Sequence, residues 1–258
     1  MQTGVTLNDH DSCLSIVPVA AAHSRAEPSP LRRRDACGTI DRQARRAALH
    51  FCAEGISIAN PHKIIWIDPD DIVFKTCCDH DLQPNDVKPG DWDLDRVPVD
   101  DSAKYRSIRQ RYVEGASWEE TELFKDYAAR LRAGEVIRGA DSLLKLKRQY
   151  EAKVDPLFRD FCARGFLIER DKSGRPKNLP HVHIGRDGEI LFGTKGNHRL
   201  SMAKLLSLKS FPCQVRARHS EWQTIRDMIA SDGADSFLKC RQELRCHPDL
   251  IDLIYPNQ

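Results

Sequence analysis

The stretch FGTKGNHRLSMAKLL, residues 192–206, decides the fold that we expect for the second half of the chain. An apolar run ends at Phe192, two glycines follow at Gly193 and Gly196, and a helical apolar pattern begins after Asn197. Glycine permits a tight turn and lets a ligand approach the backbone closely. The pattern predicts a strand, a glycine turn and the N-terminus of a helix.

The same stretch is a candidate anion site, because the first N–H groups of a helix are unpaired and its dipole is positive there. Lys195, His198 and Arg199 add cationic or donor groups at this place, and arginine can bind phosphate oxygens with two parallel hydrogen bonds. We predict that the phosphates of a nucleotide bind to Gly193, Lys195, Gly196, Asn197, His198 and Arg199. The alternative is an ordinary strand-to-helix turn with surface charges, in which glycine, asparagine and lysine are also common.

Around this stretch, alternating or β-branched runs predict short strands, and apolar residues spaced three or four apart predict helices. The expected strands are residues 64–67, 72–74, 181–184, 189–192 and 211–216. The expected helices are residues 39–52, 102–114, 117–133, 142–164 and 197–206, with more from residue 220. A Ser-x-x-Glu capping box at Ser117 opens one of them, and Gly165 is expected to stop another. Residues 75–101 are expected to be a long loop that is functional or mobile.

This order of elements predicts an α+β fold, with a small mixed sheet and a helix-rich insertion at about residues 102–165. Residues 1–36 are small, polar and proline-containing, and we expect a poorly ordered tail there. Residues 37–258 are expected to form a single domain that ends in helices.

Composition restricts the partners of the chain. Its 258 residues carry 40 basic and 38 acidic side chains, a net charge of +2, which is too balanced to indicate nucleic acid or an anionic membrane by charge alone. No run is long enough to span a bilayer. The apolar run at residues 14–22 is short, contains Pro18, and follows Asp9 and Asp11 where a signal peptide carries basic residues, so a cytoplasmic location without a membrane partner is expected.

The nine cysteines predict reduced thiols rather than disulfides, because their number is odd and no Cys-x-x-Cys pair occurs. Two groups could be drawn as metal half-sites, Cys77-Cys78-Asp79-His80 and Cys240 with Cys246-His247. Neither has the ligand spacing of a zinc site, so no metal-ligating residue is predicted.

Gly196-Asn197-His198-Arg199, preceded by the apolar run 190–192 and Gly193, resembles the Gly-Cys-His-Arg motif of sulfiredoxin. It is also similar to the Gly-x-x-Arg phosphate motif of ParB-type N-terminal domains. Residues 64–74 resemble the opening strand and turn of those domains, and residues 211–215 the strand after the motif helix. The likeness to this ParB/sulfiredoxin-like superfamily covers residues 64–74 and about 181–217. The helices between resemble those of little-characterised ParB-like proteins rather than true partition proteins.

The resemblance implies a nucleotide, ATP or CTP, held with Mg²⁺. Arg199 and His198 would bind phosphate, and the backbone of Gly196 and Asn197 would cradle the same group. Asn197 stands where sulfiredoxin has its nucleophilic cysteine, and an amide supplies no thiolate, so sulfiredoxin chemistry is not expected. The absence of an evident helix-turn-helix followed by a dimerising tail argues against ParB-like spreading on DNA.

Some members of this superfamily are kinases of small hydroxylated molecules, and such chemistry needs a carboxylate near the phosphate. Asp91 and Asp93, which flank Trp92 in the long loop, are the predicted catalytic residues, and Asp187 and Glu189 are weaker candidates. The alternative for Asp91 and Asp93 is a solvated acidic loop.

Five further residues are predicted contacts to phosphate or substrate: His181, His183, Arg216, Arg218 and His219. The two strand histidines lie two apart and share a face, and the other three end the next strand, near the turn. The alternative is a set of ordinary polar residues of a sheet.

Two interpretations follow. The first is a nucleotide-binding protein that uses ATP or CTP for phosphoryl transfer or hydrolysis, with a small-molecule acceptor as an open option. The second is a non-enzymatic, nucleotide-gated or DNA-associated interaction protein, whose basic residues would contact a nucleic-acid backbone. Those residues are Arg32, Arg33, Arg34, Arg42, Arg45 and Arg46.

Overall fold

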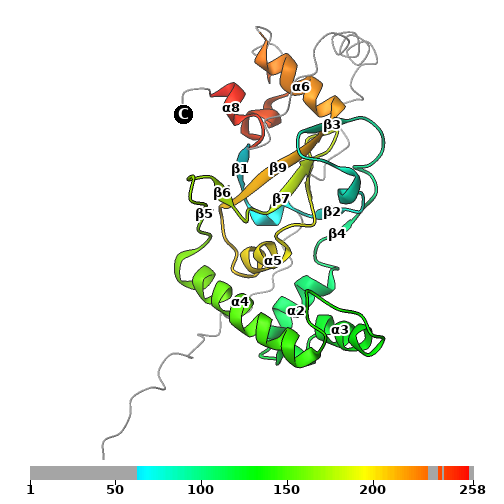
Figure 1. Ribbon diagram of the computed structural model, residues 1–258. Helices are drawn as coiled ribbons and strands as arrows, with labels where there is room; N and C mark the ends of the chain where they lie inside the picture. Colours follow the sequence, from blue (N-terminus) through cyan, green and yellow to red (C-terminus); the bar gives the residue numbers. More distant parts are fainter. Residues whose placement is uncertain (1–62, 232–237, 240, 256–258) are drawn as a thin grey trace, which may run out of the picture. The chain divides into compact units, whose positions relative to one another are not determined.

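The computed structural model describes residues 63–231, 238–239 and 241–255 (Figure 1). The tail at residues 1–36 and the helix at residues 39–52 lie outside this range. The division into a tail and a single domain from residue 37 therefore stays a prediction.

The described residues form a mixed seven-stranded sheet in the order β1-β9-β7-β8-β2-β4, with β3 also paired to β9. Its strands are β1 (Ile64–Ile67), β2 (Phe74–Thr76), β3 (Asp86–Lys88), β4 (Arg96–Pro98), β7 (His181–Ile184), β8 (Ile190–Phe192) and β9 (Phe211–His219). The pairs β2/β8, β3/β9 and β7/β9 are parallel, whereas β1/β9, β2/β4 and β7/β8 are antiparallel. The predicted mixed sheet of an α+β fold is thereby confirmed.

The described helices are α2 (Ala103–Tyr112), α3 (Glu122–Arg132), α4 (Leu143–Arg164), α5 (Asn197–Leu205), α6 (Ser220–Ala230) and α8 (Ile251–Ile254). The capping box at Ser117 is present, but it opens a 3₁₀ turn, Trp118–Glu120, before α3 begins at Glu122. Gly165 caps α4 with φ 67°, as predicted, and Pro156 lies within α4 without splitting it. Three helices, α2 to α4, thus lie between β4 and the strand that begins at Glu169, in the region where a helix-rich insertion was predicted.

The expectation of a long loop at residues 75–101 was wrong. This segment contains the end of β2, a 3₁₀ turn at Asp79–Asp81, and the strands β3 and β4. Strands of three residues are too short to show an alternating pattern. Here β2 pairs with β8 and β3 with β9, more than a hundred residues away in sequence, and β4 pairs with β2.

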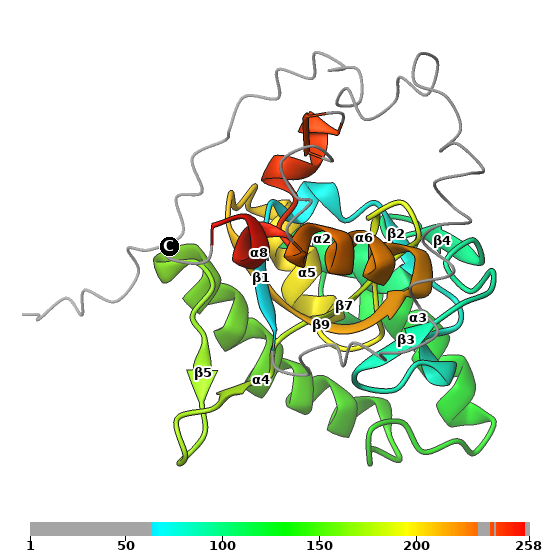
Figure 2. The same ribbon diagram turned by 90° about the horizontal axis from the view of Figure 1, so that it is seen from above.

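Helix α5 lies between the sheet and the inserted helices (Figure 1), and it packs against α2 and α4. A short ribbon, β5 (Glu169–Arg170) with β6 (Pro176–Lys177), leads from the end of α4 back to the sheet (Figure 2). The inserted helices share an aromatic core in which Trp118 packs against Phe124 and Tyr150. Helix α5 therefore packs against the inserted helices and also against the 3₁₀ turn Pro69–Asp71 that follows β1.

Candidate functional site

The predicted strand, turn and helix at residues 192–206 are confirmed. Strand β8 ends at Phe192, Gly196 is the N-cap of α5 with φ 98° and ψ 14°, and α5 begins at Asn197. A Cβ at Gly196 would come within 2.7 Å of Cα of Pro180. Glycine is therefore required there twice, for its left-handed backbone and for the close packing. We call residues 193–196 the α5 turn.

Hydrogen bonds hold the α5 turn in place. The Lys195 carbonyl accepts a bond from the His181 N–H at 3.1 Å, and the Thr194 carbonyl accepts one from Nδ2 of Asn197 at 2.5 Å. The Asn197 side chain thus fixes the turn. The first N–H groups of α5 have no partner in their own helix and point out of its N-terminus.

A cavity of about 150 Å³ adjoins this helix end. We call it the α5 cavity, and it is lined by Lys104, Arg138, Leu157, Thr194, Gly196, Asn197, His198 and Arg199. Its basic residues come from three places: Lys104 from α2, Arg138 from the segment before α4, and Arg199 from α5 itself. The arrangement concentrates positive charge where the helix dipole is also positive.

His198 contributes a buried Nε2 atom that has no hydrogen-bond partner. Its ring meets Tyr150 edge-on, with the ring centroids 5.4 Å apart. Burial, followed by the charges of Arg138, Lys104 and Arg199, lowers the pKa of His198 to about 3. The imidazole is therefore neutral at pH 7, and its Nε2 is a polar atom for which the protein supplies no partner.

A second group of cations lies beside the α5 turn. Burial and the nearby charges of Arg216 and Arg199 lower the pKa of Lys195. Burial and the charges of Arg216 and Lys195 lower the pKa of His181 to about 4. The structure thus brings His181 and Arg216 to the turn, as predicted.

Most of these cations have no acidic partner. Within residues 63–231, 238–239 and 241–255, no carboxylate lies within ion-pair distance of Lys104, Arg138, Lys195 or Arg216. Arg199 does have one: its Nη2 lies 3.0 Å from Oε1 of Glu169 in β5. Unpaired cations that repel one another are stabilised when an anion binds among them.

Asp79 is the carboxylate that reaches the α5 turn, and sequence analysis did not select it as a site residue. Its Oδ2 accepts a hydrogen bond from Oγ1 of Thr194, and its Oδ1 lies 2.7 Å from Nε2 of buried His183. The hydrogen bond with His183, followed by that with Thr194, lowers the pKa of Asp79 although burial opposes the shift. Asp79 and His183 therefore tie the 3₁₀ turn to the α5 turn.

The predicted catalytic pair, Asp91 and Asp93, lies on Arg186 instead. Nη2 of Arg186 is 2.8 Å from Oδ1 of Asp91 and 2.6 Å from Oδ1 of Asp93. Asp93 is buried and also accepts the Arg186 N–H at 2.9 Å. The ring of Trp92, between them in sequence, packs near His183 and His219. These carboxylates hold the loop to the β7–β8 hairpin, and the structure does not bring them into contact with the α5 turn.

Two other predicted contacts also have partners elsewhere. Arg218 is buried and forms a two-fold ion pair with Asp249, at 2.7 and 2.9 Å. Nε2 of His219 lies 2.8 Å from the Gly90 carbonyl oxygen. Its Nδ1 accepts a hydrogen bond from the Glu221 N–H and so caps α6. Of the weaker candidates, Asp187 is exposed and Glu189 is paired with Arg96.

Lys104 and Arg138 are the basic residues that sequence analysis missed. Neither lies in a motif, and only tertiary packing brings them to α5. A weak signal existed at Arg138-Gly139, where a residue followed by glycine between apolar positions indicates a tight turn.

Among the described residues, no group of three or more histidine, cysteine, aspartate or glutamate side chains could hold a metal ion. Within the same part of the chain, no helix combines the length and apolar character needed to cross a membrane. Comparisons with protein-family models, curated proteins and solved structures gave no match. The ligand of the site is therefore inferred from its own side chains.

Proposed function

We propose that this chain binds a nucleoside triphosphate, ATP or CTP, with its phosphates at the α5 turn. The observation that carries the proposal is the α5 cavity, where a helix N-terminus, three basic side chains and an unpartnered histidine nitrogen converge. Phosphate oxygens accept hydrogen bonds from the N–H groups and the basic side chains, and from the histidine nitrogen in the tautomer or the charged form that places a proton there. An ordinary surface turn does not require three cations around one cavity, two of them without an acidic partner among the described residues, so the alternative explanation accounts for less.

The proposal includes membership of the ParB/sulfiredoxin-like superfamily. In its support, β1, the β7–β8 hairpin, α5 and β9 follow one another in the order that the resemblance implies. Mg²⁺ would be bound chiefly by the phosphates of the ligand, which is common for this ion. When bound, it would neutralise part of the phosphate charge.

Sulfiredoxin chemistry is not part of the proposal. Asn197 holds the turn through its side-chain amide. The next cysteine along the sequence, Cys213, is fully buried in β9. Burial raises the pKa of its thiol well above the usual range, which disfavours the reactive thiolate.

Phosphoryl transfer or hydrolysis at the same site is a second candidate, and the position of Asp79 favours it. Asp79 is the carboxylate in contact with the turn, and a carboxylate beside the phosphates is what such chemistry needs. Product analysis by ³¹P NMR tests this candidate, with turnover expected in the wild type and lost in Asp79→Asn. The DNA-associated alternative rests on residues 32–34 and 42–46, which lie outside the described range.

Binding is tested by isothermal titration of ATP, CTP, GTP and UTP with Mg²⁺, on the wild type and on Arg199→Ala. Loss of a charged hydrogen-bond partner is expected to weaken binding by about tenfold or more. Arg164→Ala is the matched control, since Arg164 is an exposed arginine paired with Asp160 at the far end of α4. Absence of binding at millimolar nucleotide would refute the proposal, and binding that survives Arg199→Ala would place the site elsewhere.

A further inference from the structure

The α5 cavity joins two parts of the chain that are distant in sequence. The turn and Arg199 come from the sheet side, whereas Lys104 and Arg138 belong to the helical insertion. Burial and the charge of Arg138 lower the pKa of Lys104, so the two cations are close enough to repel each other. The insertion therefore supplies charge to the cavity in addition to packing against α5.

Arg138 has an unusual backbone conformation for a non-glycine residue. Its φ is 51°, and Gly139 follows with φ 74°. The flanking Ile137 and Ala140 exchange two backbone hydrogen bonds, at 2.9 and 2.8 Å, and both are buried. Two successive residues with positive φ are typical of a type I′ turn, which favours asparagine and glycine rather than arginine.

The arginine side chain has a use that offsets this backbone preference. Its guanidinium lies over the ring of Tyr150, 5.5 Å from the ring centroid, and Tyr150 also contacts His198. Strained positions of this kind cluster at ligand-binding sites. The rigid turn and the aromatic ring together aim Arg138 at the cavity.

The size of the cavity restricts its occupant. Pockets for drug-sized ligands measure about 300–1,000 Å³. At about 150 Å³ the α5 cavity is too small for a nucleoside, yet it has room for several water molecules or one tetrahedral anion. Its polar groups are cations, N–H groups and the neutral His198, which together favour an occupant with more than one negative charge.

We propose that the α5 cavity binds the terminal, doubly charged phosphoryl group of the ligand, and that Lys104 and Arg138 select for that group. This inference rests on the proposed nucleotide binding and adds to it which part of the ligand enters the cavity. The base and ribose then lie outside the cavity. The helical insertion thus recognises the terminal phosphoryl group through Lys104 and Arg138.

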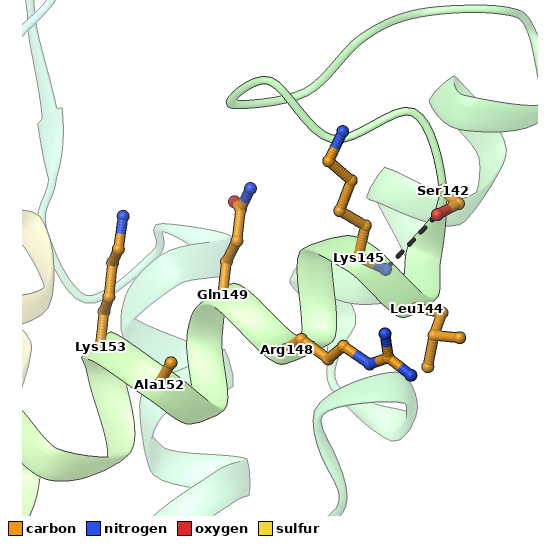
Figure 3. A pocket seen from close by; sticks show the side chains of 7 residues that line it. All are labelled: Ser142, Leu144, Lys145, Arg148, Gln149, Ala152 and Lys153. Carbon is orange, nitrogen blue, oxygen red and sulfur yellow. Dashed lines mark hydrogen bonds between the residues drawn. The ribbon is translucent and has the colours of Figure 1, made fainter.

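Two variants test the inference while preserving local structure. Arg138→Asn removes the guanidinium but keeps a residue type that accepts positive φ. Lys104→Gln removes the ammonium group near the start of α2 and keeps a good helix former. The matched controls are Arg148→Gln and Lys153→Gln, whose side chains line a separate pocket along α4 (Figure 3), not the cavity.

The measurements are titration calorimetry with a nucleoside triphosphate and Mg²⁺, and ³¹P NMR of the bound ligand. We expect Arg138→Asn and Lys104→Gln each to weaken triphosphate binding by about tenfold, and the two controls by less than about twofold. The terminal phosphorus signal should shift most on binding to the wild type, and this shift should shrink in Arg138→Asn.

The possible results separate the two proposals. If the triphosphate binds and depends on Arg199, but Arg138→Asn and Lys104→Gln behave like the controls, the cavity assignment is wrong while nucleotide binding stands. If no nucleotide binds, the proposed function itself fails. Inorganic phosphate that binds as tightly as the triphosphate, with the same dependence on Arg138, would overturn the assignment to the terminal group of a larger ligand.

Discussion

Two regions of this molecule bring cations together, and they differ in how that charge is balanced. Around Asp249, three cations and an indole N–H converge on one fully buried carboxylate; we call these the Asp249 cluster, formed by Asp249, Lys63, Arg218, Trp222 and Arg226. In the α5 cavity, Lys104 and Arg138 have no carboxylate partner among the described residues. The cations of the first region share one buried acid, whereas in the second, within the described part of the chain, only Arg199 has a carboxylate partner, Glu169.

The electrostatics follow the same division. Burial alone would raise the pKa of Asp249, but Arg218, Arg226 and Lys63 together hold it at about 2. In the α5 cavity, burial and then the charges of Arg138, Lys104 and Arg199 lower the pKa of His198. A buried charge that is paired internally indicates a structural role, and cations that gather at a cavity without a carboxylate partner indicate a binding role.

The largest expected effect on stability comes from removing the negative charge of the Asp249 cluster. Asp249→Asn leaves buried Arg218 without its charge partner and is expected to lower the free energy of unfolding by about 3–5 kcal/mol. The control is Asp252→Asn, whose half-exposed carboxylate pairs with Lys63 and Arg226 and should contribute less than about 1 kcal/mol. Urea denaturation at pH 7 measures both.

The same variant has a pH signature. Because the folded-state pKa of Asp249 lies below its unfolded value, its stabilisation is complete above about pH 5 and is lost as the pH falls through 4 towards 2. Asp249→Asn should lack this part of the acid destabilisation. If Asp249→Asn and Asp252→Asn lower the free energy of unfolding equally, the Asp249 cluster does not have the structural role that sets it apart from the cavity.

A smaller effect is expected at the α5 turn. Gly196→Ala places a Cβ within 2.7 Å of Pro180 and forces alanine to φ 98°, and should cost about 1–3 kcal/mol together with ligand affinity. Gly165→Ala is the matched control, because its φ is 67° but nothing lies within 4 Å of the new Cβ. The difference between the two variants, measured by thermal and urea denaturation, isolates the packing against Pro180. If the losses are equal, the turn is not tightly held.

The α5 site also shows which of its parts could be predicted from the sequence and which could not. The α5 turn was predictable because strand, glycines and helix start lie within fifteen consecutive residues, and their preferences are local. Lys104, Arg138 and Asp79 were not, since they reach the turn only through the packing of α2 and α4 against α5 and of the 3₁₀ turn against β7.

Asp91 and Asp93 show the complementary error. Their residue type suits catalysis, but both carboxylates form ion pairs with Arg186, which lies more than ninety positions later in the chain. Residue chemistry predicts what a side chain can do, and the nearest opposite charge decides what it does. Arg218 is a second example: it was predicted to contact the ligand, but it is paired with the buried Asp249.

The smallest effect concerns two histidines, one from each region. His247 lies next to the Asp249 cluster and its Nε2 is 2.7 Å from the Gly188 carbonyl, whereas Nε2 of His198 has no partner. Burial is the first cause that lowers the pKa of both. Without ligand, each opposes folding as the pH falls below about 6.5, because the unfolded chain takes up a proton that the folded chain does not.

A bound phosphate should change only one of them. Negative charge in the α5 cavity stabilises the imidazolium form and raises the pKa of His198 from about 3, while His247 keeps its value. Titration of the histidine ring protons by NMR between pH 3 and 7, with and without a nucleoside triphosphate, measures both shifts, and His198→Gln assigns the signal. If the ligand binds and neither histidine responds, its phosphates do not enter the cavity. An upward shift at His198 alone would place negative charge where the protein itself supplies none.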